Sequence, residues 1–408
     1  MKTLYFDNAA TTPLDDRVRE VMNLNQSDAL ANPSSVHIFG QAANAALDNA
    51  RETAAAEFGA EFRSIIFTSG ATEANNLVLR GVLKAFYRSF RSEALIPPRI
   101  IISGIEHDSV IHTAQDIAEE GAEVIIIPAE KNGIVSAKKI IEAINERTIL
   151  VSVMTVNNET GAIQPIAEIG KAIRSIREER VNMKSLFSNS PYPIFHTDAV
   201  QAVRYMSCKL DELNADIITV SGHKIGGPRG VGALIMKPIG KYGLGKAIQP
   251  IIMGGGQEFG MRSGTENVSA IFGFGEAIMI AGHEREKNIK RVSEIKRVFW
   301  EEVRKYFPKA AINGPAEKEW GRKSVPHILN VWLPGYNSAD IVTKCDMAGL
   351  AISYGSACGA KSFKPSHVLT AMGLSEKRVR ESVRISFGPG DTMAEAKEGA
   401  RRIKKALG

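Results

Sequence analysis

The sequence predicts an α/β fold, with a large domain built on a mostly parallel, seven-stranded sheet and a smaller α+β domain. Two observations lead to this prediction. Between about residues 15 and 265, seven short apolar runs alternate with amphipathic helical patterns, and the runs are continuously rich in Val and Ile. Such runs form strands that are covered on both faces, as parallel sheets require. After about residue 270 the pattern changes to a mixture of charged helices and strands.

The strands of the large domain are predicted in chain order from the apolar runs. They are Ile65–Thr68, Arg99–Ser103, Val124–Ile127, Ile149–Val153, Ile194–Thr197, Ile217–Val220 and Val231–Met236. The stretches between them have helical periodicity. In Ser136–Ile144, for example, the serine is a suitable N-cap and the apolar residues share one face.

The small domain is predicted from the mixed pattern of charged helices and strands after about residue 270. A charged helix covers Glu284–Lys305, and strands are expected over His327–Trp332 and Val383–Phe387. The predicted domains are residues 15–265 for the large one and residues 1–14 with 266–408 for the small one.

Composition narrows the class of protein. The net charge of +6 over 408 residues is modest and indicates a solvated basic surface, so no direct binding of nucleic acid is expected. No apolar run approaches the roughly 18 residues of a membrane helix, and the N-terminus has no apolar signal region. Three cysteines (Cys208, Cys345 and Cys358) are too few for a disulfide framework. We therefore expect a cytoplasmic protein without a membrane segment, and we expect no metal site.

The first chemical motif lies where a predicted strand meets a helix, in Phe67–Asn76. Small residues turn the chain there, and the free N–H groups and hydroxyls at a helix N-terminus suit a phosphate group. Taken alone, the motif is equally compatible with an ordinary turn that a threonine caps.

Two further motifs follow neighbouring strands. Lys224 ends Ser221-Gly222-His223-Lys224, directly after Ile217–Val220, and Asp198 follows Ile194–Thr197 with Gln201 three residues on. Side chains at the carboxyl ends of such strands point into the crevice where α/β sheets bind ligands. An aldehyde cofactor needs an amine there, and pyridoxal phosphate (PLP) also needs a carboxylate against its ring nitrogen. A lone lysine is more often a solvated side chain, and a lone Asp is more often a helix cap.

Cys358 is the cysteine whose setting differs. It lies in a run of small residues, Ser353–Lys361, and the amine of Lys361 would favour the reactive thiolate. Cys208 and Cys345 lie in amphipathic or helical contexts that indicate structural roles. From its neighbours alone, Cys358 is as compatible with a structural role as with a catalytic one.

Taken together, these motifs resemble the cysteine desulfurases of the bacterial iron–sulfur and nitrogen-fixation type, within the class V aminotransferases. The resemblance covers nearly the whole chain. Its segments are Tyr5–Pro13, Asn32–Ser35, Thr68–Asn76, Val156–Glu159, Ser221–Lys224, Met261–Thr265 and Gly355–Cys358. It implies the PLP-dependent transferase fold of type I, PLP as cofactor, L-cysteine as substrate and a homodimer.

The resemblance also implies a role for each matching residue. Lys224 would bind the PLP aldehyde and act as a base, His107 would stack on the ring and assist proton transfer, and Cys358 would take up the sulfur as a persulfide. The other implied PLP contacts are Ala71, Thr72, Ser221 and His223 around the phosphate, Asp198 at the ring nitrogen, Gln201 at the phenolic oxygen, and Thr265 reaching the phosphate of the neighbouring subunit. Asn158 and Arg384 would hold the substrate carboxylate.

Some features depart from the family pattern and leave alternatives open. Gly359-Ala360-Lys361 follows the cysteine where Ser or Thr is usual, and Tyr354 replaces a common serine. The chain ends at Gly408 without the extension that housekeeping members use to dock their iron–sulfur scaffold, so the sulfur-acceptor protein is open between such a scaffold and a thiolation enzyme. The alternative functions are a selenocysteine lyase, another class V PLP enzyme, or a non-catalytic binding homologue.

Overall fold

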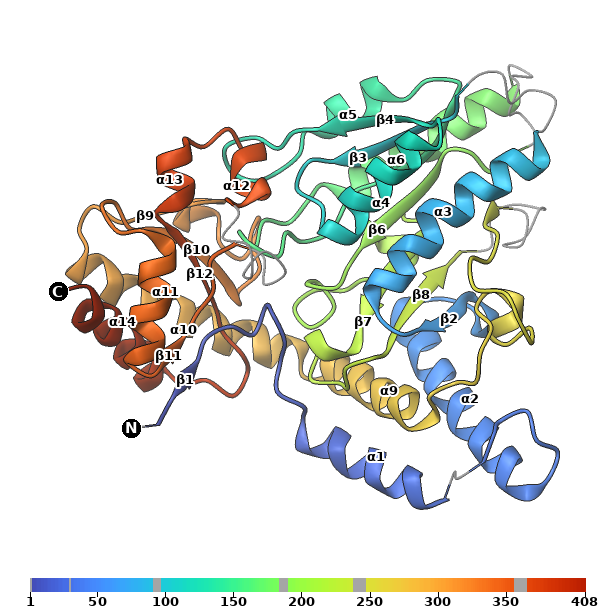
Figure 1. The fold of residues 1–408 in the computed structure, drawn as a ribbon, viewed down its shortest axis with the longest axis horizontal. Helices are drawn as coiled ribbons and strands as arrows, with labels where there is room; N and C mark the ends of the chain where they lie inside the picture. The colour runs from blue at the N-terminus through green and yellow to red at the C-terminus, as the bar shows by residue number, and fades with distance from the viewer. Residues whose placement is uncertain (1, 29–30, 91–96, 183–189, 238–246, 356–364) are drawn as a thin grey trace.

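The computed structural model describes residues 2–28, 31–90, 97–182, 190–237, 247–355 and 365–408. It confirms the α/β class, with a large sheet flanked by helices and a smaller group of strands and helices beside it (Figure 1). In this part of the chain no helix has both the length and the apolar character needed to cross a membrane.

A seven-stranded sheet lies at the centre of the larger part, in the order β2-β8-β7-β6-β5-β3-β4. The five strands β7, β6, β5, β3 and β4 run parallel to one another. β8 is antiparallel to both of its neighbours, β2 and β7. The strand bounds are β2 Ile65–Thr68, β3 Arg99–Ser103, β4 Glu123–Ile127, β5 Thr148–Ser152, β6 Ile194–Asp198, β7 Ile217–Ser221 and β8 Gly232–Met236. Each of the seven predicted strands is present, within one residue at either end.

Helices cover both faces of the sheet because alternate strand residues pack on opposite sides. Ile100 and Ile102 of β3 join a core with α3 and α4, while Ile101 joins a second core with α2, α6 and α9. The helices of this part are α1 Asp16–Asp28, α2 Ile38–Phe58, α3 Ala71–Ser89, α4 Asp108–Glu119, α5 Ala137–Ala143, α6 Ile166–Asn182, α7 Leu210–Leu213 and α9 Val268–His283. Ser136 caps α5 as predicted, its side chain accepting from Lys139 N–H.

One strand was wrongly expected to be buried. β4 is the edge of the sheet, and its Ile126 is 48% exposed. The other edge strand, β2, is fully buried, so edge position alone does not expose β4. Its apolar run reflects strand propensity rather than coverage of both faces.

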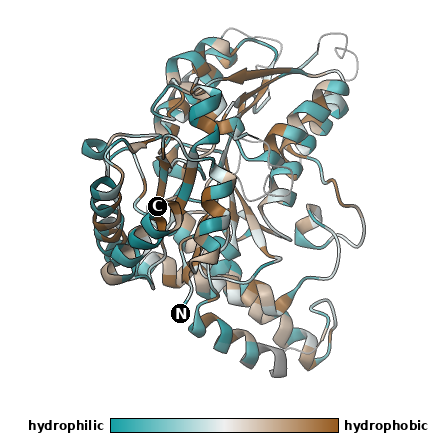
Figure 2. Cartoon of the chain, turned by 60° about the vertical axis from the view of Figure 1, so that its left-hand side comes forward, coloured by the Kyte–Doolittle hydropathy of each residue, from teal (hydrophilic) through white to brown (hydrophobic). Residues whose placement is uncertain are grey.

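The smaller part contains a three-stranded antiparallel sheet in the order β12-β10-β9 and a parallel pair of β1 with β11. Its elements are β1 Leu4–Tyr5, β9 Ala311–Ile312, β10 Ile328–Trp332, β11 Leu350–Ala351, β12 Ser382–Ser386, α10 Arg285–Tyr306, α11 Ser338–Met347, α12 His367–Ala371, α13 Glu376–Arg380 and α14 Met393–Leu407. Figure 2 shows apolar strands inside and more hydrophilic helices outside. The N-terminal segment after β1 continues toward the large sheet (Figure 1). The predicted domain limits stay a prediction.

Candidate active site

The carboxyl ends of several strands meet at one edge of the large sheet and form a cavity. β3, β5, β6 and β7 are mutually parallel, and β2 runs the same way because two antiparallel pairings separate it from β7. The segments that follow these strands therefore emerge at a common edge, which is where open α/β sheets bind ligands. The cavity there has a volume of about 470 Å³.

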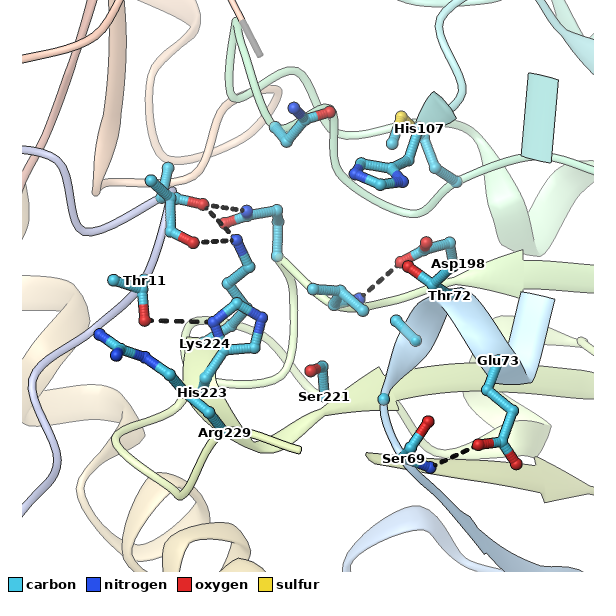
Figure 3. Close-up of a pocket in the computed structure, with 18 of the residues that line it drawn as sticks. Thr11, Ser69, Thr72, Glu73, His107, Asp198, Ser221, His223, Lys224 and Arg229 are labelled. Atoms are coloured by element: carbon cyan, nitrogen blue, oxygen red, sulfur yellow. Dashed lines mark hydrogen bonds between the residues drawn. The ribbon is translucent and has the colours of Figure 1, made fainter. Parts of the chain in front are cut away.

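Ten of the twelve predicted site residues line this cavity. They are Ala71, Thr72, His107, Asn158, Asp198, Gln201, Ser221, His223, Lys224 and Arg384. Figure 3 shows Lys224 and His223 on one side, with Asp198 and Thr72 on the other and His107 above them. Thr265 is exposed and does not line the cavity. Cys358 lies outside the described residues.

Lys224 is oriented by the N-terminal segment. It lies in the short 3₁₀ turn η2 (Gly222–Lys224) directly after β7, and its Nζ donates to the carbonyl oxygens of Ala9 (2.7 Å) and Ala10 (2.6 Å). Backbone carbonyls are suitable acceptors for an ammonium group. A primary amine is thereby held in the cavity by groups that carry no charge of their own.

Asp198 faces the cavity from the end of β6 and is also hydrogen-bonded. Its Oδ2 accepts from Asn75 Nδ2 (2.9 Å) and its Oδ1 from Val200 N–H (3.0 Å). Asn75 is fully buried in α3 and also donates to Ser109 Oγ (2.9 Å). These two donors hold the carboxyl group of Asp198 in a fixed orientation at the cavity, opposite the amine of Lys224.

His107 has a defined tautomer. The backbone N–H of Ser109 donates to His107 Nδ1 (3.1 Å), and Ser109 Oγ lies 2.9 Å from the same nitrogen. A ring nitrogen that accepts from an amide carries a lone pair, so the neutral ring has its proton on Nε2. Burial lowers the pKa of His107, although the charges of Asp198 and Asp108 oppose this shift. The side chain is therefore a neutral imidazole with an Nε2–H donor.

The N-terminus of α3 provides a place for an anion. The helix begins at Ala71 after Gly70, which gives it no side-chain cap and has a φ of 149°, a value that favours glycine. Gly232 of β8 packs against this turn, since a Cβ there would lie 2.9 Å from the Gly70 Cα. Free N–H groups and the positive end of the helix dipole attract a phosphate. Thr68 Oγ1 does accept from the Gly70 N–H in this turn (3.4 Å), but no side chain caps the first turn of α3 itself.

Further polar groups surround the same end of the cavity. Thr72, Ser221 and His223 line it, and so does Arg229, a cation that sequence reasoning missed. Burial, together with the positive charges of Lys224 and Arg229, lowers the pKa of His223 to about 4. His223 is therefore neutral at neutral pH, and its Nδ1 lies 3.2 Å from Thr11 Oγ1.

Arg384 brings a buried cation to the cavity, from β12 of the smaller part. It is 1% exposed; Nη1 donates to the carbonyl of Asn158 (3.0 Å) and Nη2 to the carboxylate of Asp7 (2.9 Å). Within the described structure, Arg384 Nε and Asn158 Oδ1 are buried without a hydrogen-bond partner. Unsatisfied buried polar atoms are costly. Their presence in the lining suits a polar ligand with donor and acceptor atoms of its own.

Two buried acids directly adjoin predicted site residues and were missed in the sequence. Glu106 precedes His107 and accepts from Met154 N–H (2.8 Å), and burial raises its pKa to about 8. Glu159 follows Asn158 and accepts from Ser366 Oγ (2.5 Å), and burial raises its pKa as well. This hydrogen bond joins Glu159 to the N-cap residue of α12.

The cysteines differ in what they can do. Cys208 and Cys345 are buried free thiols, and burial raises the pKa of each to about 12. Thiols with such pKa values are protonated at neutral pH and are poor nucleophiles. Of the three cysteines in the sequence, these two are therefore unsuited to catalysis.

Known proteins that are similar to this chain are class V aminotransferases, cysteine desulfurases and NifS-like proteins. The family model for the class V aminotransferases matches residues 4–398. The chain is 37% identical over 388 residues to the cysteine desulfurase IscS of Dictyoglomus turgidum, covering 95% of this chain and 90% of the relative. A solved NifS-like protein superposes with a TM-score of 0.86 at 31% identity and 99% coverage of both chains. The solved structure of SspA in complex with cysteine gives a TM-score of 0.77 at 34% identity, covering 95% of this chain and 99% of the other.

Proposed function

Because the chain belongs to the class V aminotransferase family, among its PLP-dependent cysteine desulfurases, we propose that Lys224, Asp198 and His107 carry out the removal of sulfur from L-cysteine. The observation that carries this assignment is a single cavity that holds an amine from β7, a carboxylate from β6 and an anion site at α3. These are the three groups that PLP requires for its aldehyde, its ring nitrogen and its phosphate.

The residues present fit PLP. Lys224 would hold the aldehyde, Asp198 the ring nitrogen and Gln201 the phenolic oxygen, with Ala71, Thr72, Ser221 and His223 around the phosphate. The uncapped start of α3 and the buried carboxylate held by Asn75 support this arrangement. When bound, PLP supplies an electron sink that stabilises negative charge at the substrate Cα.

Arg384 and Asn158 would bind the carboxylate of L-cysteine. A guanidinium forms paired hydrogen bonds with a carboxylate, and Arg384 Nε is a donor without a partner among the described residues. The amide nitrogen of Asn158 would be the further donor. The substrate carboxylate would compete with Asp7 for the Arg384 guanidinium. Before the substrate binds, Asp7 compensates this buried positive charge.

The proton transfers would use two groups of the cavity wall. The Lys224 amine, once exchanged for the substrate amine, would take the Cα proton, and the neutral His107 ring would assist from its Nε2 side. The tautomer of His107 supports this role, because the neutral ring carries its proton on Nε2 and would donate from there.

Cys358 would receive the sulfur. Its thiolate attacks the substrate sulfur, so that an S–S bond forms as the substrate Cβ–S bond breaks, and protons returned to the carbon skeleton give L-alanine. The buried state of Cys208 and Cys345 supports this choice by elimination. A sulfur-acceptor protein, either an iron–sulfur scaffold or a thiolation enzyme, would then take the persulfide sulfur. Free thiols in the fold are consistent with the reducing cytoplasm as the place of reaction.

We further propose a homodimer with shared active sites. Thr265 is exposed and does not line the cavity of its own chain, which supports a role at the cofactor phosphate of the neighbouring chain. Large apolar side chains are exposed at the start of α2 and in residues 252–259. They are Val36, Ile38, Phe39, Ile252, Met253 and Phe259. Exposed apolar groups of this size mark interaction sites, and two-fold dimers are the commonest oligomers.

The proposal is tested by incubating the purified protein with L-cysteine and a reductant, and measuring alanine and sulfide together. Equal amounts of the two products are expected. Pyruvate and ammonia in place of alanine, or alanine without sulfide, would exclude a desulfurase.

A further inference from the structure

His327 is a buried polar residue that contacts the cavity residue Gln201 but takes no part in the proposed reaction. It directly precedes β10 and is 4% exposed. Its Nε2 lies 3.1 Å from Gln201 Oε1, and Gln201 Nε2 in turn donates to the carbonyl of Ala9 (2.9 Å). Ala9 is also an acceptor for Lys224, so Gln201 and Lys224 share one N-terminal carbonyl, and His327 reaches it through Gln201.

The partners of Gln201 determine which way its amide points. The carbonyl of Ala9 can only accept, so the Gln201 atom beside it must be the amide nitrogen. The amide oxygen then faces His327, and the imidazole nitrogen opposite that oxygen must donate. His327 is thus neutral with its proton on Nε2. The reversed amide would bring two oxygens together at Ala9.

The surroundings of His327 favour the same tautomer. Among the described residues its Nδ1 has no hydrogen-bond partner and is buried, where an unused lone pair costs less than an unused N–H. Burial lowers the pKa of the ring well below its ordinary value, and so do the charges of Lys296, Arg204, Arg384 and Lys224. Tyr205 stacks on the ring with centroids 4.3 Å apart and 17° between the planes, which fixes the ring orientation.

We propose that His327 is a positioning residue that holds the Gln201 amide with its nitrogen as a hydrogen-bond donor at the cavity. The inference rests on the proposed function, in which the phenolic oxygen of PLP meets Gln201. One N–H of Gln201 is used by Ala9, and the second is available to that oxygen. Without His327 the Ala9 carbonyl alone opposes reversal, so the amide is held less firmly, and in the reversed state it would present an oxygen to a negatively charged oxygen.

The effect can be measured on the bound cofactor without substrate, as the pH midpoint of the change in its visible absorption. A donor to the phenolic oxygen stabilises its negative charge and favours the deprotonated form, so losing the donor raises the midpoint. We expect His327→Leu and Gln201→Leu each to raise it by about one pH unit, as the loss of a charge-assisted hydrogen bond implies. The double variant should show no further rise, because both changes remove one interaction.

His327→Gln is the rescue variant, since its amide can again donate toward Gln201 and should keep the wild-type midpoint. His196→Leu is the matched control: that ring is also buried and neutral, but it contacts Ser152 and Thr219 rather than Gln201. A His327→Leu midpoint equal to wild type, or a His327→Gln midpoint as high as that of Gln201→Leu, overturns the proposal. If His327→Leu does not fold, His327→Gln decides. Wild-type protein that binds no PLP at all contradicts the proposed function instead.

Discussion

Arg384 Nη2 and Asp7 Oδ1 lie 2.9 Å apart and join β12 to the segment that follows β1, at the wall of the cavity. Arg384 is almost fully buried, whereas Asp7 is partly exposed. A buried guanidinium requires such a partner, because an uncompensated buried charge destabilises the fold strongly. The ion pair with Asp7 therefore stabilises the buried Arg384 guanidinium, which we propose binds the substrate carboxylate.

The first prediction concerns this cation. Arg384→Lys keeps the charge but loses the fork of two donors, so the KM for L-cysteine should rise about 10- to 100-fold, the loss expected for a charge-assisted contact. Titration of the bound cofactor's absorption with L-cysteine measures the affinity directly. Arg402→Lys is the control, since Arg402 is also buried but donates to Lys2 and Gly349 far from the cavity. An unchanged affinity in Arg384→Lys would show that the carboxylate binds elsewhere.

The second prediction concerns stability and pH. Burial raises the folded-state pKa of Glu106 from 4.5 to about 8, so folding takes up a proton between these values. The contribution of Glu106 to stability is complete below about pH 4.5 and is lost as the pH rises through about 8. Glu106→Gln mimics the protonated acid. It should unfold at a similar urea concentration to wild type at pH 5 and at a higher one at pH 8. If Glu106→Gln and wild type differed in unfolding urea concentration by the same amount at pH 5 and at pH 8, the raised pKa of Glu106 would be contradicted.

The third prediction concerns Lys224. Lys224→Ala removes the amine that the carbonyls of Ala9 and Ala10 orient, so the protein should lose covalent PLP, its visible absorption and its turnover. Circular dichroism and the unfolding midpoint should stay near wild type, because the side chain fills a cavity rather than a core. Lys237→Ala is the control, a lysine paired with Asp211 on the surface. Full turnover in Lys224→Ala would eliminate the mechanism.

Most of the sheet and the cavity could be predicted because both follow from local patterns. Asp198 and Lys224 each follow a continuous apolar run, and parallel strands bring such positions to one edge. The groups that were missed act through contacts distant in sequence. Ala9 lies 215 residues from Lys224, and its carbonyl has no side-chain signal. His327 and Gln201 are 126 residues apart. The exposure of β4 was missed because coverage of a strand depends on which distant segments pack on it, as the fully buried edge strand β2 shows.

The fourth prediction separates a shared site from an independent one. If Thr265 serves the partner's cofactor, a heterodimer of Lys224→Ala with Thr265→Val has one site with both changes and one with neither. The intact site should bind PLP with wild-type affinity, whereas neither homodimer does. Mixing the two tagged variants, isolating the heterodimer and titrating it with PLP tests this. Failure to recover a tight site, or a stable and fully active monomer in sedimentation, would contradict the shared arrangement.

The most direct test of sulfur transfer is the mass of the peptide that contains Cys358 after treatment of the protein with L-cysteine in the absence of reductant. The account predicts a gain of one sulfur atom on that peptide and none on the peptides of Cys208 and Cys345, whose thiols are buried. Cys358→Ala should still show the spectral change on binding L-cysteine. Its sulfide release should fall at least about 100-fold, equivalent to about 2.7 kcal/mol of transition-state stabilisation. An unmodified Cys358 peptide, with alanine and sulfide formed by Cys358→Ala at the wild-type rate, would contradict the account.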